Sequence, residues 1–319
     1  MLRVFEAFAG YGSQSIALRN LGIEYEVVAI SEIDKYAIKA YEAIHGPTNN
    51  LGDICKIDPS DIPDHDLFTY SFPCQDLSVA GKQAGLGKGT RSGLLYECEK
   101  IIEAKKPKYL LLENVKNLVG KKFKPQFDEW LDYLKSLGYT NYWQVLNAKN
   151  YGVPQNRERV FIVSILGDHK PYEFPKPIPL DKCIADILED KVGEKYYLSK
   201  EVGYIEIDLP CIAASRGRNP DNPSDRTAGA PTEQRLEFNT KGTSNTITTV
   251  QKDNYVVETT YRIRKLTPRE CFRLMGMRDD DIDKIQAASI SNTQQYKMAG
   301  NSIVVNVLEE IFKNLFMEG

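Results

Sequence analysis

Apolar residues in the first half of the chain alternate between strand-like runs and helix-like spacing. The strand-like runs cover residues 2–8, 25–31, 67–71 and 109–113, and helical patterns run through Leu21 and over residues 34–45. Strands that alternate with helices predict βαβ units around a mostly parallel sheet covered on both faces. The pattern therefore predicts a doubly wound α/β fold, in which ligands bind at the carboxyl ends of the strands.

The pattern changes near residue 168. Four prolines lie within residues 170–180 and exclude a central strand or a helix there, so a linker is expected. Residues 210–231 are rich in Arg, Asn, Asp, Pro and Gly with little periodicity, which predicts irregular structure. Residues 243–258 alternate in strand fashion around Asn254.

The last segment has the clearest helical pattern, because Val304, Leu308, Ile311 and Leu315 share one helix face. An apolar face needs a partner, so we expect the final ~25 residues to return to the first domain. The prediction is a discontinuous first domain of residues 1–167 plus 291–319 and a smaller, irregular domain of residues 168–290.

Composition narrows the class of protein. The chain has 319 residues, 42% hydrophobic and 27% charged, as in a globular protein of about two domains. Its net charge of −3 gives no general signal for a polyanion partner. The six scattered cysteines and three histidines favour a reducing cytoplasm and predict no disulfide framework and no metal site. No signal peptide and no membrane span are expected.

A glycine-containing turn follows the first predicted strand, in Phe8-Ala9-Gly10-Tyr11-Gly12-Ser13. Glu32 lies 22 residues beyond Gly10, where a carboxylate can accept hydrogen bonds from two ribose hydroxyls. The third glycine of a dinucleotide fingerprint is absent, which favours a nucleoside without phosphates over NAD or FAD. The alternative is a plain tight turn.

Phe72-Pro73-Cys74-Gln75 ends the third predicted strand. A cysteine fixed by a proline at the rim of a sheet suits a nucleophilic thiolate, although an inert buried cysteine is commoner. Residues 76–93 are glycine-rich and carry Lys82, Lys88 and Arg91, so this stretch could close over an anion.

Two further motifs carry charge at strand ends. Glu113 ends the run 109–112 and could donate a proton to a bound base, or be a capping or salt-bridged residue. Arg157 and Arg159 precede the apolar strand 160–164 and could hold a planar acceptor, or be solvated charges.

The order of these motifs resembles the cytosine carbon-5 DNA methyltransferases of bacteria and phages. The similar blocks are Phe8-Ala9-Gly10, Phe72-Pro73-Cys74-Gln75, Glu113-Asn114-Val115, Gln155-Asn156-Arg157-Glu158-Arg159, Leu266-Thr267-Pro268-Arg269-Glu270-Cys271 and Ala299-Gly300-Asn301-Ser302. The resemblance covers residues 1–165 and 262–316 and implies a Rossmann-like methyltransferase fold. In this family the segment between them is the variable target-recognition region, which corresponds to the irregular second domain.

The resemblance also implies a reaction. The Cys74 thiolate adds to ring carbon 6 of a cytosine flipped out of duplex DNA, and Glu113 protonates ring nitrogen 3. Arg159, with Arg157, holds the carbonyl oxygen of the base. Carbon 5 then takes the methyl group of S-adenosylmethionine, which leaves S-adenosylhomocysteine.

By the same resemblance, each ligand has an expected set of contacts. Expected cofactor contacts are Phe8, Gly10, Gly12, Ser13, Glu32, Ile33, Asp53, Ile54, Pro73, Leu94, Asn301 and Ser302. Expected DNA contacts are Gln75, Lys82, Arg91, Arg216, Arg218, Arg226, Arg235, Thr246 and Ile247. Many relatives have an aromatic residue where this chain has Ile33, so adenine stacking on that side is expected to be apolar contact only. Thr246-Ile247 resembles a Thr-Leu pair near the target base but equally suits a core strand.

The expected partners follow from this reading. Residues 211–265 hold nine Lys and Arg against six Asp and Glu, a local basic excess suited to double-stranded DNA. The expected role is DNA modification in a restriction system, with a cognate endonuclease as functional partner, or protection of phage DNA against restriction. The protein is expected to be a cytoplasmic monomer. The alternatives are a tRNA cytosine-5 methyltransferase, an inactive DNA-binding regulator and, more distantly, a nicotinamide oxidoreductase.

Overall fold

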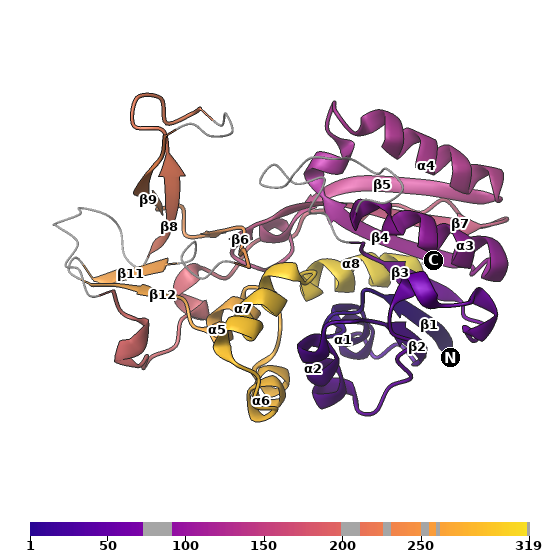
Figure 1. The fold of residues 1–319 in the computed structure, drawn as a ribbon, viewed down its shortest axis with the longest axis horizontal. Coiled ribbons are helices and arrows are strands. Elements are labelled where there is room, and N and C mark those ends of the chain that lie inside the picture. The colour runs from indigo at the N-terminus through magenta and orange to yellow at the C-terminus, as the bar shows by residue number, and fades with distance from the viewer. Residues whose placement is uncertain (73–90, 199–210, 226–230, 250–254, 260–261, 318–319) are drawn as a thin grey trace. The chain divides into compact units, whose positions relative to one another are not determined.

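The computed structural model describes residues 1–72, 91–198, 211–225, 231–249, 255–259 and 262–317 (Figure 1). The chain forms two compact units. Unit 1 comprises Met1–Asn147, Glu158–Pro177 and Ile303–Gly319, and unit 2 comprises Ala148–Arg157 and Ile178–Ser302. Residues 303–319 of the C-terminal segment belong to unit 1. The bounds of the compact units differ from the expected domain boundaries, because residues 148–157 and 291–302 belong to unit 2 and residues 168–177 belong to unit 1.

Unit 1 alternates strands and helices along the chain. Its elements are β1 (Leu2–Ala7), α1 (Ser13–Asn20), β2 (Tyr25–Ser31), α2 (Lys35–His45), β3 (Leu67–Tyr70), α3 (Leu95–Lys105), β4 (Tyr109–Val115), α4 (Lys124–Ser136), β5 (Tyr139–Asn147), β7 (Glu158–Leu166) and α8 (Val305–Phe316). Residues 170–180 contain no helix or strand, as their prolines predicted.

The sheet of unit 1 has the strand order β2-β1-β3-β4-β7-β5. The pairs β1–β2, β1–β3 and β3–β4 are parallel, whereas β7 pairs antiparallel with both β4 and β5. The expectation of a mostly parallel α/β sheet is confirmed for β1 to β4, whereas the predicted strand 160–164, which is part of β7, is antiparallel to its neighbours. The sequence analysis did not predict β5, an edge strand whose exposed and half-buried positions hide its period.

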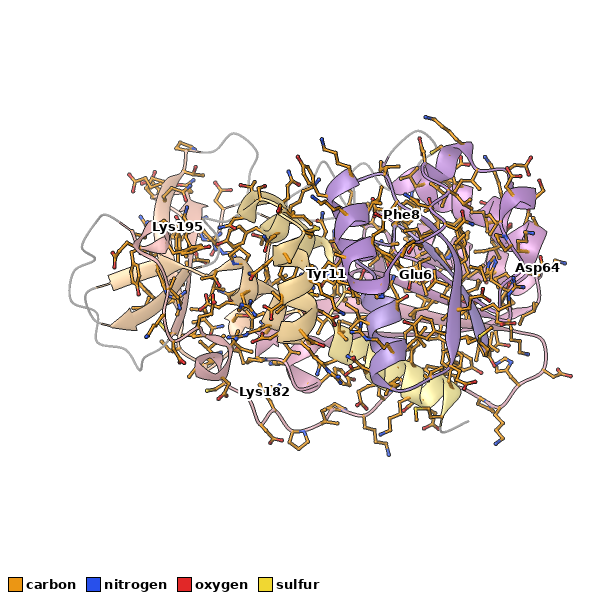
Figure 2. All side chains as sticks on the ribbon, turned by 90° about the horizontal axis from the view of Figure 1, so that it is seen from below. Glu6, Phe8, Tyr11, Asp64, Lys182 and Lys195 are labelled. Atoms are coloured by element: carbon orange, nitrogen blue, oxygen red, sulfur yellow. The ribbon has the colours of Figure 1, made fainter. Side chains whose placement is uncertain are left out.

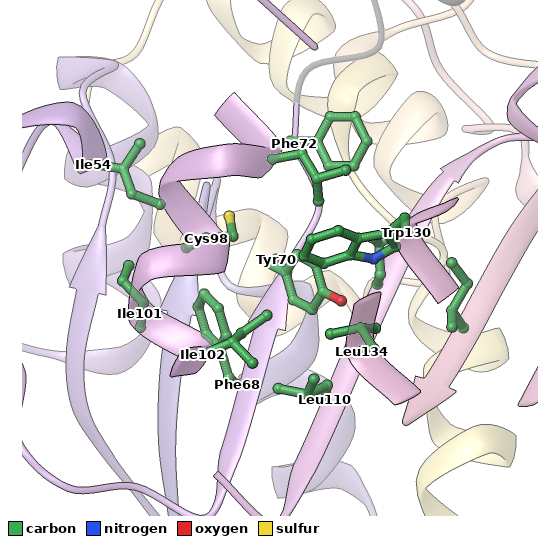
Figure 3. Packing of buried hydrophobic residues seen from close by; sticks show 14 of the residues in the cluster. Ile54, Phe68, Tyr70, Phe72, Cys98, Ile101, Ile102, Leu110, Trp130 and Leu134 are labelled. Carbon is green, nitrogen blue, oxygen red and sulfur yellow. The ribbon is translucent and has the colours of Figure 1, made fainter. Parts of the chain in front are cut away.

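Alternate residues of the central strands face opposite layers of helices. Phe68 and Tyr70 belong to an apolar cluster with Ile101 of α3 and Trp130 of α4 (Figure 3). Between them, Thr69 accepts a 3.4 Å hydrogen bond from Gln14 of α1. Because a strand presents successive side chains to opposite faces, this sheet is covered on both sides, as in a doubly wound fold.

The C-terminal helix α8 packs against α1. Asn20, at the end of α1, donates a 2.7 Å hydrogen bond to the Glu309 carboxylate. At the other end of α8, the ring of Phe316 meets Tyr109 edge-to-face at 5.2 Å. The buried residues of α8 include Leu308, Ile311 and Leu315, so the predicted apolar face is the one that packs.

Unit 2 contains smaller sheets and short helices. Its elements are β6 (Gln155–Asn156), β8 (Cys211–Arg218), β9 (Glu233–Asn239), β10 (Ser244–Asn245), β11 (Tyr255–Thr259), β12 (Arg262–Lys265), α5 (Pro268–Arg273), α6 (Asp279–Ala287) and α7 (Asn292–Asn301). A four-stranded sheet has the order β12-β11-β8-β9. The prediction of irregular structure over 210–231 is therefore wrong for β8, and Asn254 lies outside the described residues. Antiparallel pairing with β9 and β11 organises this polar sequence.

The residues at the start of α5 show how the local sequence fixes where a helix of unit 2 begins. Thr267 and Glu270 form a capping box around Pro268, which is favoured at the first turn of a helix. The Glu270 carboxylate also pairs with Arg264 at 2.7 Å, and both side chains are fully buried. No helix in the described part of the chain is long and apolar enough to span a membrane.

Candidate functional site

The turn after β1 has an unusual backbone. Phe8, Gly10 and Gly12 have φ angles of 56°, 59° and 82°, in the left-handed region that side chains disfavour. A methyl group on Gly12 would lie 2.5 Å from Nε2 of His45 and 2.7 Å from the ring of Tyr41, whereas one on Gly10 would meet no atom within 4 Å. Gly12 therefore permits close packing on α2, and Gly10 borders open space.

Glu32 joins the end of β2 to this turn. One carboxylate oxygen accepts a 2.9 Å hydrogen bond from the backbone amide of Gly10, and the other accepts from the amides of Ile33 and Asp34, each at 2.8 Å. The carboxylate is thus held in one orientation at the carboxyl end of the strand. The side chain of Ile33 beside it is 73% exposed.

The segment around residue 53 lies next to the end of β2. The hydroxyl of Ser31 donates a 2.7 Å hydrogen bond to the Gly52 carbonyl. Asp53 caps the short helix Ile54–Lys56, and Ile54 is buried in the same apolar cluster against which Phe8 and Leu94 pack. The structure therefore gathers the expected cofactor residues of unit 1 around the ends of β1 and β2, except Pro73, which lies outside the described residues.

Glu6, on β1 ahead of this turn, is a buried carboxyl group that the sequence analysis missed. Glu6 is fully buried and accepts a 2.8 Å hydrogen bond from the Ser15 hydroxyl of α1, which also lies 3.3 Å from the Tyr41 hydroxyl. Burial raises the pKa of Glu6 to about 7. Figure 2 labels Glu6 with Phe8 and Tyr11 of the turn. The sequence gave no sign that Glu6 is buried, because a single acidic residue within an apolar strand forms no recognisable motif.

Two ionisable side chains meet at the end of β4. Arg159, opposite Val115 in the β4–β7 register, places Nε 3.2 Å from an oxygen of the Glu113 carboxylate. The two side chains are only 18% and 11% exposed. The next residue, Asn114, is buried and donates a 3.2 Å hydrogen bond to the carbonyl of Phe72. Asn114, which follows Glu113 in β4, thus ties the end of this strand to Phe72, the last described residue before Pro73 and Cys74.

Several expected residues fall where nothing is described. Pro73, Cys74, Gln75, Lys82 and Arg226 lie outside the described residues, as does the side chain of Arg91. Among the residues that the structure does describe, no group of three or more His, Cys, Asp or Glu side chains could hold a metal ion.

Arg157 is used differently from Arg159. Its guanidinium is buried and donates to three backbone carbonyls of unit 2, those of Ile247 at 3.1 Å, Gly300 at 3.1 Å and Ser302 at 2.8 Å. The expectation that Arg157 touches a base stays untested, and these contacts support a positioning role instead. Arg157 ties the expected target-base segment to the expected cofactor residues at the end of α7.

Gln155, which the sequence analysis gave no role, completes this junction. It is fully buried, donates a 2.6 Å hydrogen bond to the Leu274 carbonyl and accepts a 2.9 Å bond from the Ile247 amide. The half-buried Thr246 donates a 2.8 Å hydrogen bond from its hydroxyl to the Asn156 carbonyl, and Ile247 is buried. Gln155 stood inside a recognised motif, but only the structure shows what its amide holds.

The second segment of the junction is the end of α7. A methyl group on Gly300 would lie 2.6 Å from the backbone of Thr248, so the two segments touch through a glycine. Ser302 donates a 2.9 Å hydrogen bond from its hydroxyl to Ala299, and Asn301 is exposed. Unit 2 thus joins residues 155–157, 246–248 and 300–302 in one place.

Three of the arginines expected to contact DNA lie on the β8–β9 pair. Arg216 and Arg218 are on β8 and Arg235 is on β9, directly opposite Arg216. Arg218 forms a two-pronged hydrogen bond with the Glu237 carboxylate, through Nε and through Nη2 at 2.7 Å. Nε of Arg216 lies 3.4 Å from the same carboxylate.

Comparison with known proteins agrees with the geometry. The family model for C-5 cytosine-specific DNA methylase matches residues 2–317. The chain is similar to the type II methyltransferase M2.ScrFI of Lactococcus lactis subsp. cremoris, at 42% identity over 99% of each chain. It is 35% identical to the type II methyltransferase M.NlaX of Neisseria lactamica, over 99% of this chain and 96% of the relative. The orphan methyltransferase M.SPBetaI of Bacillus phage SPbeta is 32% identical, over 98% and 97%.

Solved structures share the fold at lower identity. The Dnmt2 methyltransferase of S. pombe superposes with a TM-score of 0.69 at 20% identity, over 100% of this chain and 99% of that one. A Spodoptera frugiperda DNMT2 mutant gives 0.72 at 20% identity, over 99% and 100%. At these identities the likeness bears on the fold, which is that of a Rossmann-like methyltransferase.

Proposed function

The chain belongs to the C-5 cytosine-specific DNA methylase family, and from that premise we propose how its own residues carry out the reaction. It is a DNA (cytosine-5)-methyltransferase, so it must make a weakly nucleophilic ring carbon accept a methyl group. The observation that carries the proposal is the Glu113–Arg159 pair at 3.2 Å, with the adjacent Asn114 bonded to Phe72. This arrangement supports the proposal, because the acid and the cation lie together and the residue after Glu113 contacts Phe72, two positions before Cys74.

The proposed reaction begins with the Cys74 thiolate. Its sulfur forms a bond to ring carbon 6 of a cytosine flipped out of the duplex, while Glu113 gives a proton to ring nitrogen 3. Arg159 holds the carbonyl oxygen of the base and offsets its negative charge. Carbon 5, now part of an enamine, would take the methyl group from the donor as the bond between that group and the donor sulfur breaks, and the proton on ring nitrogen 3 would return to Glu113. Loss of the carbon-5 proton to a base then expels the thiolate.

We propose S-adenosylmethionine as the methyl donor, with S-adenosylhomocysteine as product. The donor supplies a methyl group on a positively charged sulfur. In unit 1, the fixed Glu32 carboxylate suits two ribose hydroxyls, and Gly10 borders open space that a ligand can enter. Other proposed contacts are Phe8, Gly12, Ser13, Ile33, Asp53, Ile54, Pro73, Leu94, Asn301 and Ser302. Ile33, being 73% exposed, can give the adenine apolar contact only.

Double-stranded DNA is the proposed macromolecular substrate, with residues 168–290 as the target-recognition region. Proposed DNA contacts are Gln75, Lys82, Arg91, Arg216, Arg218, Arg226, Arg235, Thr246 and Ile247. Relatives named as type II methyltransferases support a role in restriction–modification with a cognate endonuclease, and the phage relative supports protection of phage DNA. We propose a monomer that acts on DNA in the cytoplasm.

Bisulfite sequencing of DNA from a host that expresses the chain tests this function. We expect 5-methylcytosine within one short sequence motif, and none with Cys74→Ser expressed at the same level. Purified protein should transfer labelled methyl groups from S-adenosylmethionine to duplex DNA and not to tRNA. Transfer to tRNA alone would establish the RNA enzyme instead, and no transfer to either would refute the proposed function.

A further inference from the structure

The β8–β9 pair of unit 2 has one apolar and one arginine-bearing face. On one face, Ala213 and Phe238 stand opposite each other and pack in an apolar cluster with Tyr255 and Val257. Side chains alternate along a strand, so the residues between them point the other way. That second face carries the pairs Ala214–Glu237, Arg216–Arg235 and Arg218–Glu233.

The second face carries three arginines against two glutamates. Arg216 and Arg235 are directly opposite each other, an arrangement of like charges that destabilises a sheet. Arg235 is exposed, and the Arg216 side chain is 35% exposed. A sheet that keeps two arginines opposite each other is suited to an external anion between or beside them, such as phosphate.

Glu237 holds Arg218 in a fixed pose on the same face. Two oxygens of one carboxylate accept from Nε and Nη2, which occupies one edge of the planar guanidinium. The Arg218 side chain is 17% exposed, half as much as that of Arg216. The carboxylate bonds Arg218 through two nitrogens and touches Arg216 only through Nε at 3.4 Å, so it offsets the charge of Arg218 more than that of Arg216. Of the two, Arg218 is therefore the one suited to a neutral acceptor.

The remaining end of the Arg218 fork has a definite chemical match. Its two parallel N–H groups, one on Nη1 and one on Nη2, fit the two acceptors O6 and N7 that guanine presents in the major groove. A pre-oriented side chain loses little conformational entropy on binding, which strengthens discrimination between bases.

We propose that Arg218, held by Glu237, reads a guanine of the target duplex, while Arg216 and Arg235 bind its phosphate backbone. Glu237 is then a specificity-determining residue that never touches DNA. The inference rests on the proposed function, because it takes duplex DNA as the substrate. Beyond that function, it assigns base reading and phosphate binding to different arginines of the same sheet face.

The test compares methylated motifs by bisulfite sequencing in hosts expressing variants. Arg218→Ala, Arg218→Lys and Glu237→Gln should lose preference at one G·C pair of the motif, by about ten-fold to a hundred-fold. Arg216→Ala and Arg235→Ala should keep the motif and lower methylation at all sites equally, with a salt dependence reduced by about one unit of slope per arginine. Arg278→Ala, an exposed arginine outside β8 and β9, is the matched control.

The outcomes are separable from failure of the proposed function. If Arg218→Lys and Glu237→Gln fold with wild-type melting temperatures and methylate an unchanged motif, the inference is overturned. Competition binding with duplexes made from 7-deazaguanine, which lacks N7, gives a second readout that needs no methyl transfer. Wild type should prefer ordinary DNA at least several-fold, and Arg218→Lys should show no preference. Equal binding of both duplexes by wild type would also overturn the inference.

Discussion

Arg157 and Arg159 stand two residues apart in one motif and serve different ends. Arg159 faces the Glu113 carboxylate in unit 1, where a substrate base is proposed to bind. Arg157 is buried among the backbone carbonyls of Ile247, Gly300 and Ser302 in unit 2. A charged donor shared by three carbonyls fixes their separation, because each bond weakens if a segment moves. The chemistry of a residue type is thus insufficient to assign its role.

This contrast predicts separable effects of the two arginines. Arg157→Ala leaves buried carbonyls without a donor and should lower the free energy of unfolding by about 2–4 kcal/mol, with Arg157→Lys restoring part of it. Arg159→Ala leaves the Glu113 carboxyl without its cation, so it should lose some stability, less than Arg157→Ala because Glu113 can take up a proton, and it should lose methyl transfer at saturating substrate. Thermal melting and kcat measurements on the same preparations decide. An Arg157→Ala protein with wild-type stability and no kcat would instead point to contact with the substrate.

The buried Glu6 predicts a pH dependence of stability. Burial raises its pKa in the folded chain to about 7, against an ordinary value of 4.5. The folded state therefore keeps a proton that the unfolded chain releases near pH 4.5. The stability that this proton supplies is complete below pH 4.5 and is lost as the pH rises to about 7. The difference of about 2.5 pH units amounts to about 3 kcal/mol.

Glu6→Gln removes this titration while keeping an oxygen for the Ser15 hydroxyl. Urea unfolding of wild type should show a free energy that falls, relative to Glu6→Gln, by about 3 kcal/mol between pH 4.5 and 8. The exposed Glu24→Gln serves as the control and should follow wild type at every pH. If the free energies of unfolding of wild type and Glu6→Gln changed with pH in parallel, Glu6 would not have a raised pKa in the folded chain.

At the scale of elements, the turn between β1 and α1 combines structural and ligand-binding demands. Gly10 and Gly22 both have positive φ, of 59° and 69°, and a methyl group on either would meet no atom within 4 Å. Substitution by Ala therefore brings the same backbone strain at both positions, about 1–2 kcal/mol. The two differ in location, since only Gly10 donates its amide to the Glu32 carboxylate beside the proposed cofactor.

The matched pair Gly10→Ala and Gly22→Ala tests the cofactor proposal directly. Both variants should lose similar stability, whereas only Gly10→Ala should weaken S-adenosylmethionine binding, by at least ten-fold in calorimetry. Binding that is unaffected in Gly10→Ala, or weakened equally in both, would remove the ligand from this turn.

Helices and strands with a clear pattern of apolar residues could be predicted from the sequence. Strands that form only because they pair with distant strands could not. The buried strands β1, β3 and β4 read as apolar runs, and the apolar face of α8 predicted its return to unit 1. β8 was missed because its second half, Ser215 to Arg218, is polar, and only its partners β9 and β11 make it a strand. Local patterning carries no record of such long-range pairing.

For the whole molecule, the order of motifs predicted the chemistry, while the contacts between distant motifs were invisible. The Glu113 and Arg159 motifs were recognised separately, but their 3.2 Å pairing depends on the β4–β7 register. Likewise Gln155 and Arg157 join segments about 90 and 145 residues away. Sequence reasoning thus assigned residue types to a reaction, and the fold explains which of them can act together.

The central claim is covalent catalysis by Cys74 on carbon 6 of a cytosine. The most direct measurement uses duplex DNA synthesised with 5-fluorodeoxycytidine at every cytosine position, so that whichever cytosine the enzyme flips carries the fluorine. Fluorine cannot leave as a proton does, so the methylated adduct should persist. Wild type with S-adenosylmethionine should form a protein–DNA complex that survives denaturing electrophoresis, and Cys74→Ser should form none. Equal complexes with both proteins, or none from a wild type that methylates ordinary DNA, would contradict the account.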